Sequence, residues 1–263
     1  MAVIVLTSAS GSPGVTTTAV GLALTWDRPV LLVEADPTGG SAILAGYFRG
    51  QASPPDSLID LVLAHRDGDL HGAIPSVAMR IPDSDVTFIP GTRAHGQARS
   101  VAALWQPLAA ALSTLDTMGQ DVIVDAGRLG LTGAPDPLLH AADLALLVTR
   151  TDLVALAGAR SWAQTLASAF AAQGATDSFG ILNVGEGRPY ATRDVARVLT
   201  APVVTTVAWD DPAAAVFSRG ATPPGRFERS ALVRSLCSAQ DAITARVRAN
   251  TALLAPSPAG GAS

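Results

Sequence analysis

A glycine-containing stretch near the amino terminus restricts what this chain can fold into more than any other segment. It runs from residue 8 to residue 18, reads SASGSPGVTTT, and lies between an apolar run, Val3 to Leu6, and a helix-like run, Ala19 to Trp26. In α/β proteins a strand that leads through a glycine turn into a helix builds a phosphate site, because the first N–H groups and the dipole of the helix converge at the turn. The stretch therefore predicts a phosphate-binding loop, although an ordinary strand–helix turn can have the same local pattern.

The residue types inside this stretch depart from those of an ordinary P-loop. A P-loop has Lys directly before its Ser/Thr to hold the outer phosphates, and here that position is Val15. All 18 basic residues of the chain are Arg, so no lysine elsewhere can take over. Pro13 also removes one backbone N–H from a loop whose N–H groups otherwise point at phosphate. We therefore expect a weakened phosphate cradle.

The segment from Ser10 to Thr17 resembles the deviant P-loop of the ParA/MinD family of partitioning and cell-positioning ATPases. The family motif reads Lys-Gly-Gly-x-Gly-Lys-Thr-Thr, and the segment lies on it without a gap. Both lysines are missing, one at Ser10 and the other at Val15. The resemblance implies that the loop residues that bind nucleotide are Gly11, Ser12, Gly14, Val15, Thr16 and Thr17.

A carboxylate pair follows the next apolar run, Val30 to Val33. The sequence Glu34-Ala35-Asp36-Pro37 resembles the family's second motif, Asp-x-Asp-Pro, and would lie at the carboxyl end of a buried strand, where α/β sheets place their ligands. In that family the second aspartate is the switch and catalytic carboxylate, so the resemblance assigns this role to Asp36. A plain Asp-Pro-x-Gly turn is the structural alternative.

A third motif follows farther along the chain, where the sequence DVIVDAG at 121–127 reads as a buried strand that ends in the carboxylate of Asp125, in the pattern called Walker B. Asp125 would bind Mg²⁺ through water, together with the hydroxyl of Thr16. With Asp36, these residues make up the predicted metal site. An aspartate that caps the end of a strand is the alternative reading.

Two further residues complete the predicted nucleotide site. Asn183 ends an apolar run at a place where the resembled family has an asparagine that reads adenine, a role suited to an amide that both donates and accepts. Arg128, three residues after Asp125, is the nearby cation that the sequence suggests as a replacement for the lysines, since its planar fork suits phosphate. An asparagine in a turn before Gly185 and a solvated loop arginine are the alternatives.

Strand-like and helix-like segments alternate along the chain, which predicts a mainly parallel sheet covered on both faces. We expect an α/β fold with a single doubly wound sheet, of the P-loop NTPase and ParA/MinD type, over residues 1–253, followed by a disordered tail at 254–263. The predicted strands are 3–6, 30–33, 86–89, 121–124, 144–149, 179–183 and 203–207. The predicted helices are 19–26, 58–64, 101–118, 154–173 and 229–248.

Composition narrows the class of partner. The formal net charge is −4 and 15% of residues are charged, so no evident cluster of basic residues points to nucleic acid. Cys237 is the one cysteine, which excludes a disulfide within the chain, and the four histidines show no zinc-ligand spacing.

No stretch approaches the ~18 apolar residues of a membrane span, and the alanine-rich last helix has few large apolar residues to bury in lipid. We expect a cytoplasmic protein without stable membrane insertion.

The resemblance leaves two functions open. In the first, the protein is a positioning or assembly factor that binds ATP and Mg²⁺ weakly or not at all and hydrolyses little, a pseudo-ATPase similar to the TadZ/CpaE branch, which helps to localise pilus machinery. In the second, it is an active but slow ATP hydrolase that acts as a nucleotide-dependent dimer in partitioning or in placing pilus or secretion machinery. Both imply a homodimer with a protein partner. A dinucleotide enzyme is excluded because the first turn lacks GxGxxG, and a capsular tyrosine kinase because the chain lacks a terminal tyrosine cluster.

Overall fold

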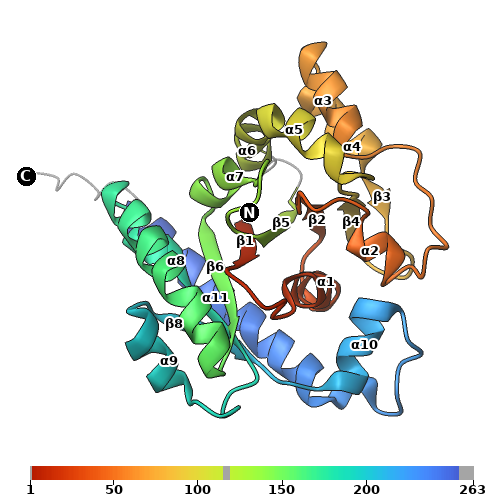
Figure 1. Cartoon of the computed structure of the whole chain (residues 1–263). Coiled ribbons are helices and arrows are strands. Elements are labelled where there is room, and N and C mark those ends of the chain that lie inside the picture. The colour runs from red at the N-terminus through yellow and green to blue at the C-terminus, as the bar shows by residue number, and fades with distance from the viewer. Residues whose placement is uncertain (1, 115–118, 255–263) are drawn as a thin grey trace, which may run out of the picture.

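The computed structural model describes residues 2–114 and 119–254, and one eight-stranded sheet runs through them (Figure 1). The strand order is β3-β4-β2-β5-β1-β6-β7-β8, and every neighbouring pair is parallel except β3 with β4. The strands are β1 (Val3–Ser8), β2 (Val30–Glu34), β3 (Met79–Arg80), β4 (Val86–Ile89), β5 (Asp121–Arg128), β6 (Leu144–Arg150), β7 (Phe179–Val184) and β8 (Val203–Val207).

The central strands form from continuous apolar runs because helices bury both of their faces. Every residue of β1 and β2 is buried, as are all but the last residue of β5 and of β6. All seven predicted strands are present, and the predicted fold class is confirmed. The short edge strand β3 was not predicted, because two residues leave no periodic pattern.

Helices cover the sheet on both faces (Figure 1). One face carries α1 (Val15–Thr25), α2 (Ala42–Ala45), α10 (Asp211–Arg219) and α11 (Ala231–Leu254). The other face carries α3 (Leu58–Arg66), α4 (Leu70–Val77), α5 (Ala98–Val101), α6 (Trp105–Ser113), α7 (Asp136–His140), α8 (Leu153–Ala172) and α9 (Thr192–Leu199).

The helix predicted over 101–118 is broken in the structure. A 3-10 turn at Ala102–Leu104 separates α5 from α6, so the prediction of one continuous helix was wrong. Pro107 is the third residue of α6, where its missing N–H costs little but would break a helix that continued from α5. Residues 115–118 and 255–263, which include most of the predicted tail, lie outside the described residues, and α11 extends through Leu254.

The apolar stripe of the last helix packs in the core of the protein. Leu232, Leu236, Ile243 and Val247 are all buried in the core cluster beneath α1, and α11 packs on β8 and α1. Its apolar face is therefore already occupied by the fold. Over residues 2–114 and 119–254, none of the helices has the length and apolar character needed to cross a bilayer.

Candidate functional site

The predicted phosphate loop lies at the carboxyl end of β1, and α1 begins directly after it at Val15. Gly14 precedes the helix, and no side chain caps the first turn of α1. The first N–H groups of α1 are therefore available to an anion. Among the predicted loop residues, Gly11 and Ser12 are exposed, whereas Gly14, Thr16 and Thr17 are half-buried.

Both positions of the missing lysines are used for packing. Val15 is 6% exposed and belongs to the core cluster beneath α1, together with Ile4 and Leu6. Ser10 lies against α8 so closely that a Cβ on Gly158 would be 2.3 Å from Ser10 Oγ. Neither side chain presents a cation to the loop.

The motif carboxylates share the face of the sheet that carries α1. Side chains alternate between the two faces of a strand. On β2, Val30 and Leu32 belong to the cluster beneath α1, so Glu34 points the same way. On β5, Ile123 belongs to the same cluster, so Asp125, two residues later, also points toward this face. The fold thus gathers acidic side chains from two neighbouring strands beside the amino end of α1.

Asp125 is completely buried, and burial is the main reason that its pKa rises to about 7. The nearby carboxylates of Glu34 and Asp36 raise the pKa further, while the Thr16 hydroxyl and the N–H of Gly127 lower it. Gly127 N donates to Oδ1 at 3.0 Å, but Oδ2 has no partner within hydrogen-bonding distance, so the Thr16 contact is a weak one. One oxygen of this carboxylate is therefore buried without a hydrogen-bond partner among the described residues.

Asp36 lies beside the segment that follows Asp125. Its Oδ1 accepts the N–H of Thr38 at 2.8 Å, which fixes the turn after β2. A Cβ on Gly127 would be 2.4 Å from Asp36 Cγ, so the Asp36 carboxyl occupies the space that a side chain at 127 would take. Gly127 has φ +61°, a conformation that favours glycine. The structure thus brings Thr16, Asp36 and Asp125 together, as the predicted metal site requires.

Glu34 has a structural role in this cluster. The hydroxyl of Ser41 and the N–H of Gly91 (3.0 Å) donate to Oε2, and the N–H of Ile43 donates to Oε1 at 3.1 Å. Burial nevertheless raises the pKa of Glu34, and Asp36 adds to the effect. Its oxygens are engaged in holding two loops to the end of β2, which leaves metal binding to its neighbours.

The predicted metal site fits Mg²⁺ by the chemistry of its donors. It offers two carboxylates and one hydroxyl, and Mg²⁺ takes oxygen ligands while keeping several waters. The partnerless Oδ2 of Asp125 is the kind of atom that such an ion or its water would satisfy. Within residues 2–114 and 119–254, no group of three or more His, Cys, Asp or Glu side chains could hold a metal by itself.

Neither Arg128 nor Asn183 lines the cavity beside the loop, although the backbone of Arg128 pairs with Ser8 at the start of the loop. The Arg128 side chain is exposed and lines a small cavity with Pro135 and Asp136. Asn183 is fully buried; it shares a face of β7 with Ile181, which belongs to the core cluster on the side away from α1. Its Nδ2 donates to Thr192 Oγ1 at 3.4 Å, and its Oδ1 has no partner. Nucleotide contact by these two residues stays a prediction.

Arg150 is a cation beside the loop that sequence reasoning missed. It ends β6, the neighbour of β1, on the face that carries α1, and its Nη2 donates to the carbonyl of Ser12 at 3.1 Å. Its guanidinium carbon lies 4.9 Å from the centre of the Trp209 ring. The signal in the sequence was an arginine at the end of an apolar run, but which strand lies beside β1 cannot be read from the sequence.

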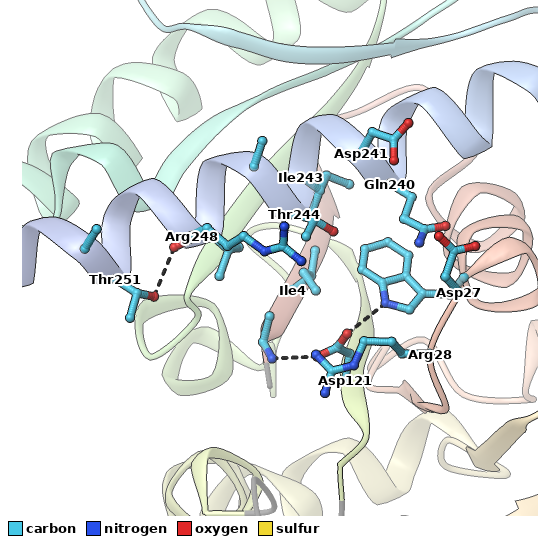
Figure 2. Close-up of a pocket in the computed structure, with 15 residues that line it drawn as sticks. Ile4, Asp27, Arg28, Asp121, Gln240, Asp241, Ile243, Thr244, Arg248 and Thr251 are labelled. Carbon is cyan, nitrogen blue, oxygen red and sulfur yellow. Dashed lines mark hydrogen bonds and ion pairs between the residues drawn. The ribbon is translucent and has the colours of Figure 1, made fainter.

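A cavity of about 190 Å³ adjoins the loop, lined among others by Ser12, Gly14, Arg150 and Trp209. This is smaller than the ~300–1,000 Å³ of typical small-molecule sites. A larger cavity of about 720 Å³ lies at the amino ends of the strands, between α11 and the start of β5 (Figure 2). We assign the site to the loop, because α/β sheets bind ligands at the carboxyl ends of their strands and the motif residues converge there.

Comparisons with known proteins bear on the fold. No model of a protein family matches the chain, and no curated protein matches its sequence. Among solved structures, the cell division ATPase MinD of Pyrococcus furiosus is similar with a TM-score of 0.70 and 18% identity, over 93% of this chain and 98% of that one. The septum site-determining protein MinD of Pyrococcus horikoshii, complexed with Mg-ADP, is similar with a TM-score of 0.68 and 16% identity, over 92% and 95%.

A ParA family ATPase from Chlorobium tepidum is similar in the same way, with a TM-score of 0.69 and 16% identity, over 91% of this chain and 98% of that one. These likenesses span nearly the whole of each chain, and at such low identity they bear on the fold alone. The resemblance read from the motifs is thereby confirmed at the level of architecture: this chain has the fold of the ParA and MinD ATPases.

Proposed function

We propose that the protein is a positioning or assembly factor with this fold, in which a weak Mg²⁺-dependent ATP site remains and hydrolysis is very slow or absent. The observation that carries the proposal is the use of both lysine positions for packing. Val15 is buried in the core, and Ser10 is pressed against α8. The chain has no lysine to offer in their place.

Loss of these lysines bears on hydrolysis more than on binding. Negative charge accumulates on the transferred phosphoryl group in the transition state, and a cation aimed at it is worth on the order of several kcal/mol. The carboxylate side of the site has no comparable defect. Thr16 and Asp125 would hold Mg²⁺ with Asp36 nearby, and the bound ion would neutralise part of the charge on the phosphates.

An active but slow ATPase is the second candidate. The observation that favours it is the clustering of Asp36, Asp125 and the Thr16 hydroxyl, since Asp36 is the catalytic carboxylate that the resemblance implies. In this case Asp36 would orient the attacking water. The two candidates differ in turnover, not in the position of the site.

We further propose that the protein forms a homodimer and recruits a protein partner in a positioning, pilus or secretion system. Supporting the dimer, two large apolar side chains stand in solvent on the same edge of the sheet as the loop. Leu153 is 66% exposed and Val154 is 81% exposed, and they are the first two residues of α8, which follows β6. A second copy that faces this edge would cover them.

The proposal is tested by measuring phosphate release from Mg²⁺–ATP in a sample already shown to bind a fluorescent ATP analogue. We expect binding by the wild type with release no faster than that of Asp36→Ala, because the transition-state cations are missing. Asp67→Ala, an exposed carboxylate after α3, serves as the control for loss of surface charge. Release that is clearly above background, lost in Asp36→Ala and kept in Asp67→Ala, would establish the active ATPase instead.

A further inference from the structure

Arg150 is held in place beside the loop from two directions. Its Nη2 donates to the carbonyl oxygen of Ser12, and its guanidinium lies over the ring of Trp209. Stacking of this kind is attractive because the face of the indole ring is negative. The Ser12 contact uses one of the five N–H donors of a guanidinium, so the group is fixed in position while most of its donors remain free.

The charge of Arg150 has no acidic partner among the described residues. None of their salt bridges includes Arg150, and its Nε is buried without a hydrogen bond. Asp152, Asp210 and Asp211 line cavities that Arg150 also lines; Asp152 and Asp210 each cap a helix, and Asp211 is exposed. Asp152 accepts the N–H of Ala155 at 2.9 Å, and Asp210 accepts that of Ala213 at 3.2 Å. A partly buried, unpaired cation is costly, and an anion is the ligand that relieves the cost.

The cavity beside the loop places this cation and the amino end of α1 around the same space. Ser12, Gly14 and Thr17 line the cavity on the loop side, and Arg150 and Trp209 line it on the other. The uncapped first turn of α1 also attracts negative charge. Arg128, in contrast, is not among the residues that line this cavity.

We propose that Arg150, held by Trp209, is the cation that binds the phosphate chain of a nucleotide in this loop, in place of the missing lysines. This inference rests on the proposed Mg²⁺–ATP site and names the residue that compensates for its altered loop. Arginine fits the task because its planar fork makes paired hydrogen bonds to phosphate oxygens. Because Arg150 projects from β6 and not from the loop, it reaches the phosphates from a different side than the lysines would.

The test compares ATP affinity of the wild type with that of Arg150→Gln, by competition of unlabelled ATP and of inorganic pyrophosphate against a fluorescent ATP analogue with Mg²⁺. Glutamine removes the charge and, because its amide nitrogen reaches only to the position of the arginine Nε, it also gives up the hydrogen bond to Ser12. We expect about a ten- to hundredfold loss of ATP affinity, which is the usual worth of a hydrogen bond to a charged group. Pyrophosphate competition should fall in parallel, and Arg150→Lys should restore part of both.

Arg160→Ala, an exposed arginine on α8, is the matched control and should bind as the wild type does. Trp209→Phe should keep affinity, whereas Trp209→Ala should lower it several-fold by releasing the guanidinium. Circular dichroism confirms that each variant is folded. If the wild type binds ATP and Arg150→Gln binds equally well, or if Arg128→Ala alone loses binding, the assignment to Arg150 is wrong and the nucleotide site stands. If the folded wild type binds no ATP at all, the nucleotide site itself is refuted.

Discussion

Asp125→Asn is expected to stabilise the metal-free protein at pH 8, although most substitutions of a buried motif residue destabilise. The carboxyl of Asp125 is fully buried, with its pKa raised to about 7 from an ordinary value of 3.8. Ionisation of this buried carboxyl destabilises the folded state relative to the unfolded state, in which the carboxyl is solvated. A shift of about three pH units corresponds to at most about 4 kcal/mol.

The sign of the pH dependence follows from the direction of this shift. Between about pH 4 and pH 7 the folded state holds a proton on Asp125 that the unfolded state has released, so stability falls as the pH rises through this window. Asparagine does not titrate, and its Oδ1 can still accept the N–H of Gly127. The advantage of the variant should therefore grow from pH 4 to pH 7 and stay constant above it.

Urea unfolding of both proteins across this pH range, with EDTA present, measures the effect. Asp121→Asn at the opposite end of β5 is the control, because Asp121 accepts from the N–H of Ala2, from Trp26 Nε1 and from Arg28. That variant should be less stable than the wild type at every pH, since an amide nitrogen would replace an acceptor. An Asp125→Asn protein that is less stable than the wild type at pH 8 would show that the buried charge is compensated.

Gly127→Ala is expected to weaken metal-dependent nucleotide binding strongly and to destabilise the fold. The new Cβ would lie 2.4 Å from Asp36 Cγ and 2.5 Å from its Oδ2, so the Asp36 carboxyl must leave its place beside Asp125. The backbone at φ +61° adds strain of roughly 1–2 kcal/mol for alanine. Displacement of Asp36 should weaken Mg²⁺–ATP binding by more than about tenfold, because a ligand to the ion or its waters is lost.

Gly68→Ala separates these two effects. Gly68 has φ +83° in the turn after α3, and a Cβ there would meet no atom within 4 Å. The Gly68→Ala variant should therefore be destabilised by backbone strain alone. Denaturant unfolding and ATP-analogue titration of both variants give the comparison. Equal loss of stability in the two variants, with nucleotide binding intact in Gly127→Ala, would show that the position of Asp36 has no importance for the site.

The sheet was predictable because its strands are buried on both faces. A continuous apolar run such as Val30 to Val33, bounded by turns and alternating with helices, predicts a buried strand of a parallel sheet. The order of the motifs also located Thr16, Asp36 and Asp125, because the carboxyl ends of parallel strands meet at one edge of a sheet. Glu34 was found by the same motif, but its hydrogen bonds to two loops are a property of the fold.

The cationic side of the site was not predictable. Arg150 lies 138 positions from Ser12 in the chain and reaches it only because β6 pairs with β1. Asn183 shows the converse, since its place at the end of a strand was predicted correctly, whereas the face on which it lies depends on how the sheet is wound. Strand order and strand face are properties of the tertiary structure, and a single sequence holds little information on either.

We propose that the metal side of the site is preserved, whereas the phosphate cradle has lost its lysines. Calorimetric titration of the wild type with ATP at pH 8, once with Mg²⁺ and once with EDTA, tests it most directly. We predict saturable binding with Mg²⁺ and loss of that binding with EDTA, because Thr16, Asp36 and Asp125 act on the nucleotide through the ion. Binding of the same affinity in EDTA, or no binding in either condition, would contradict the claim.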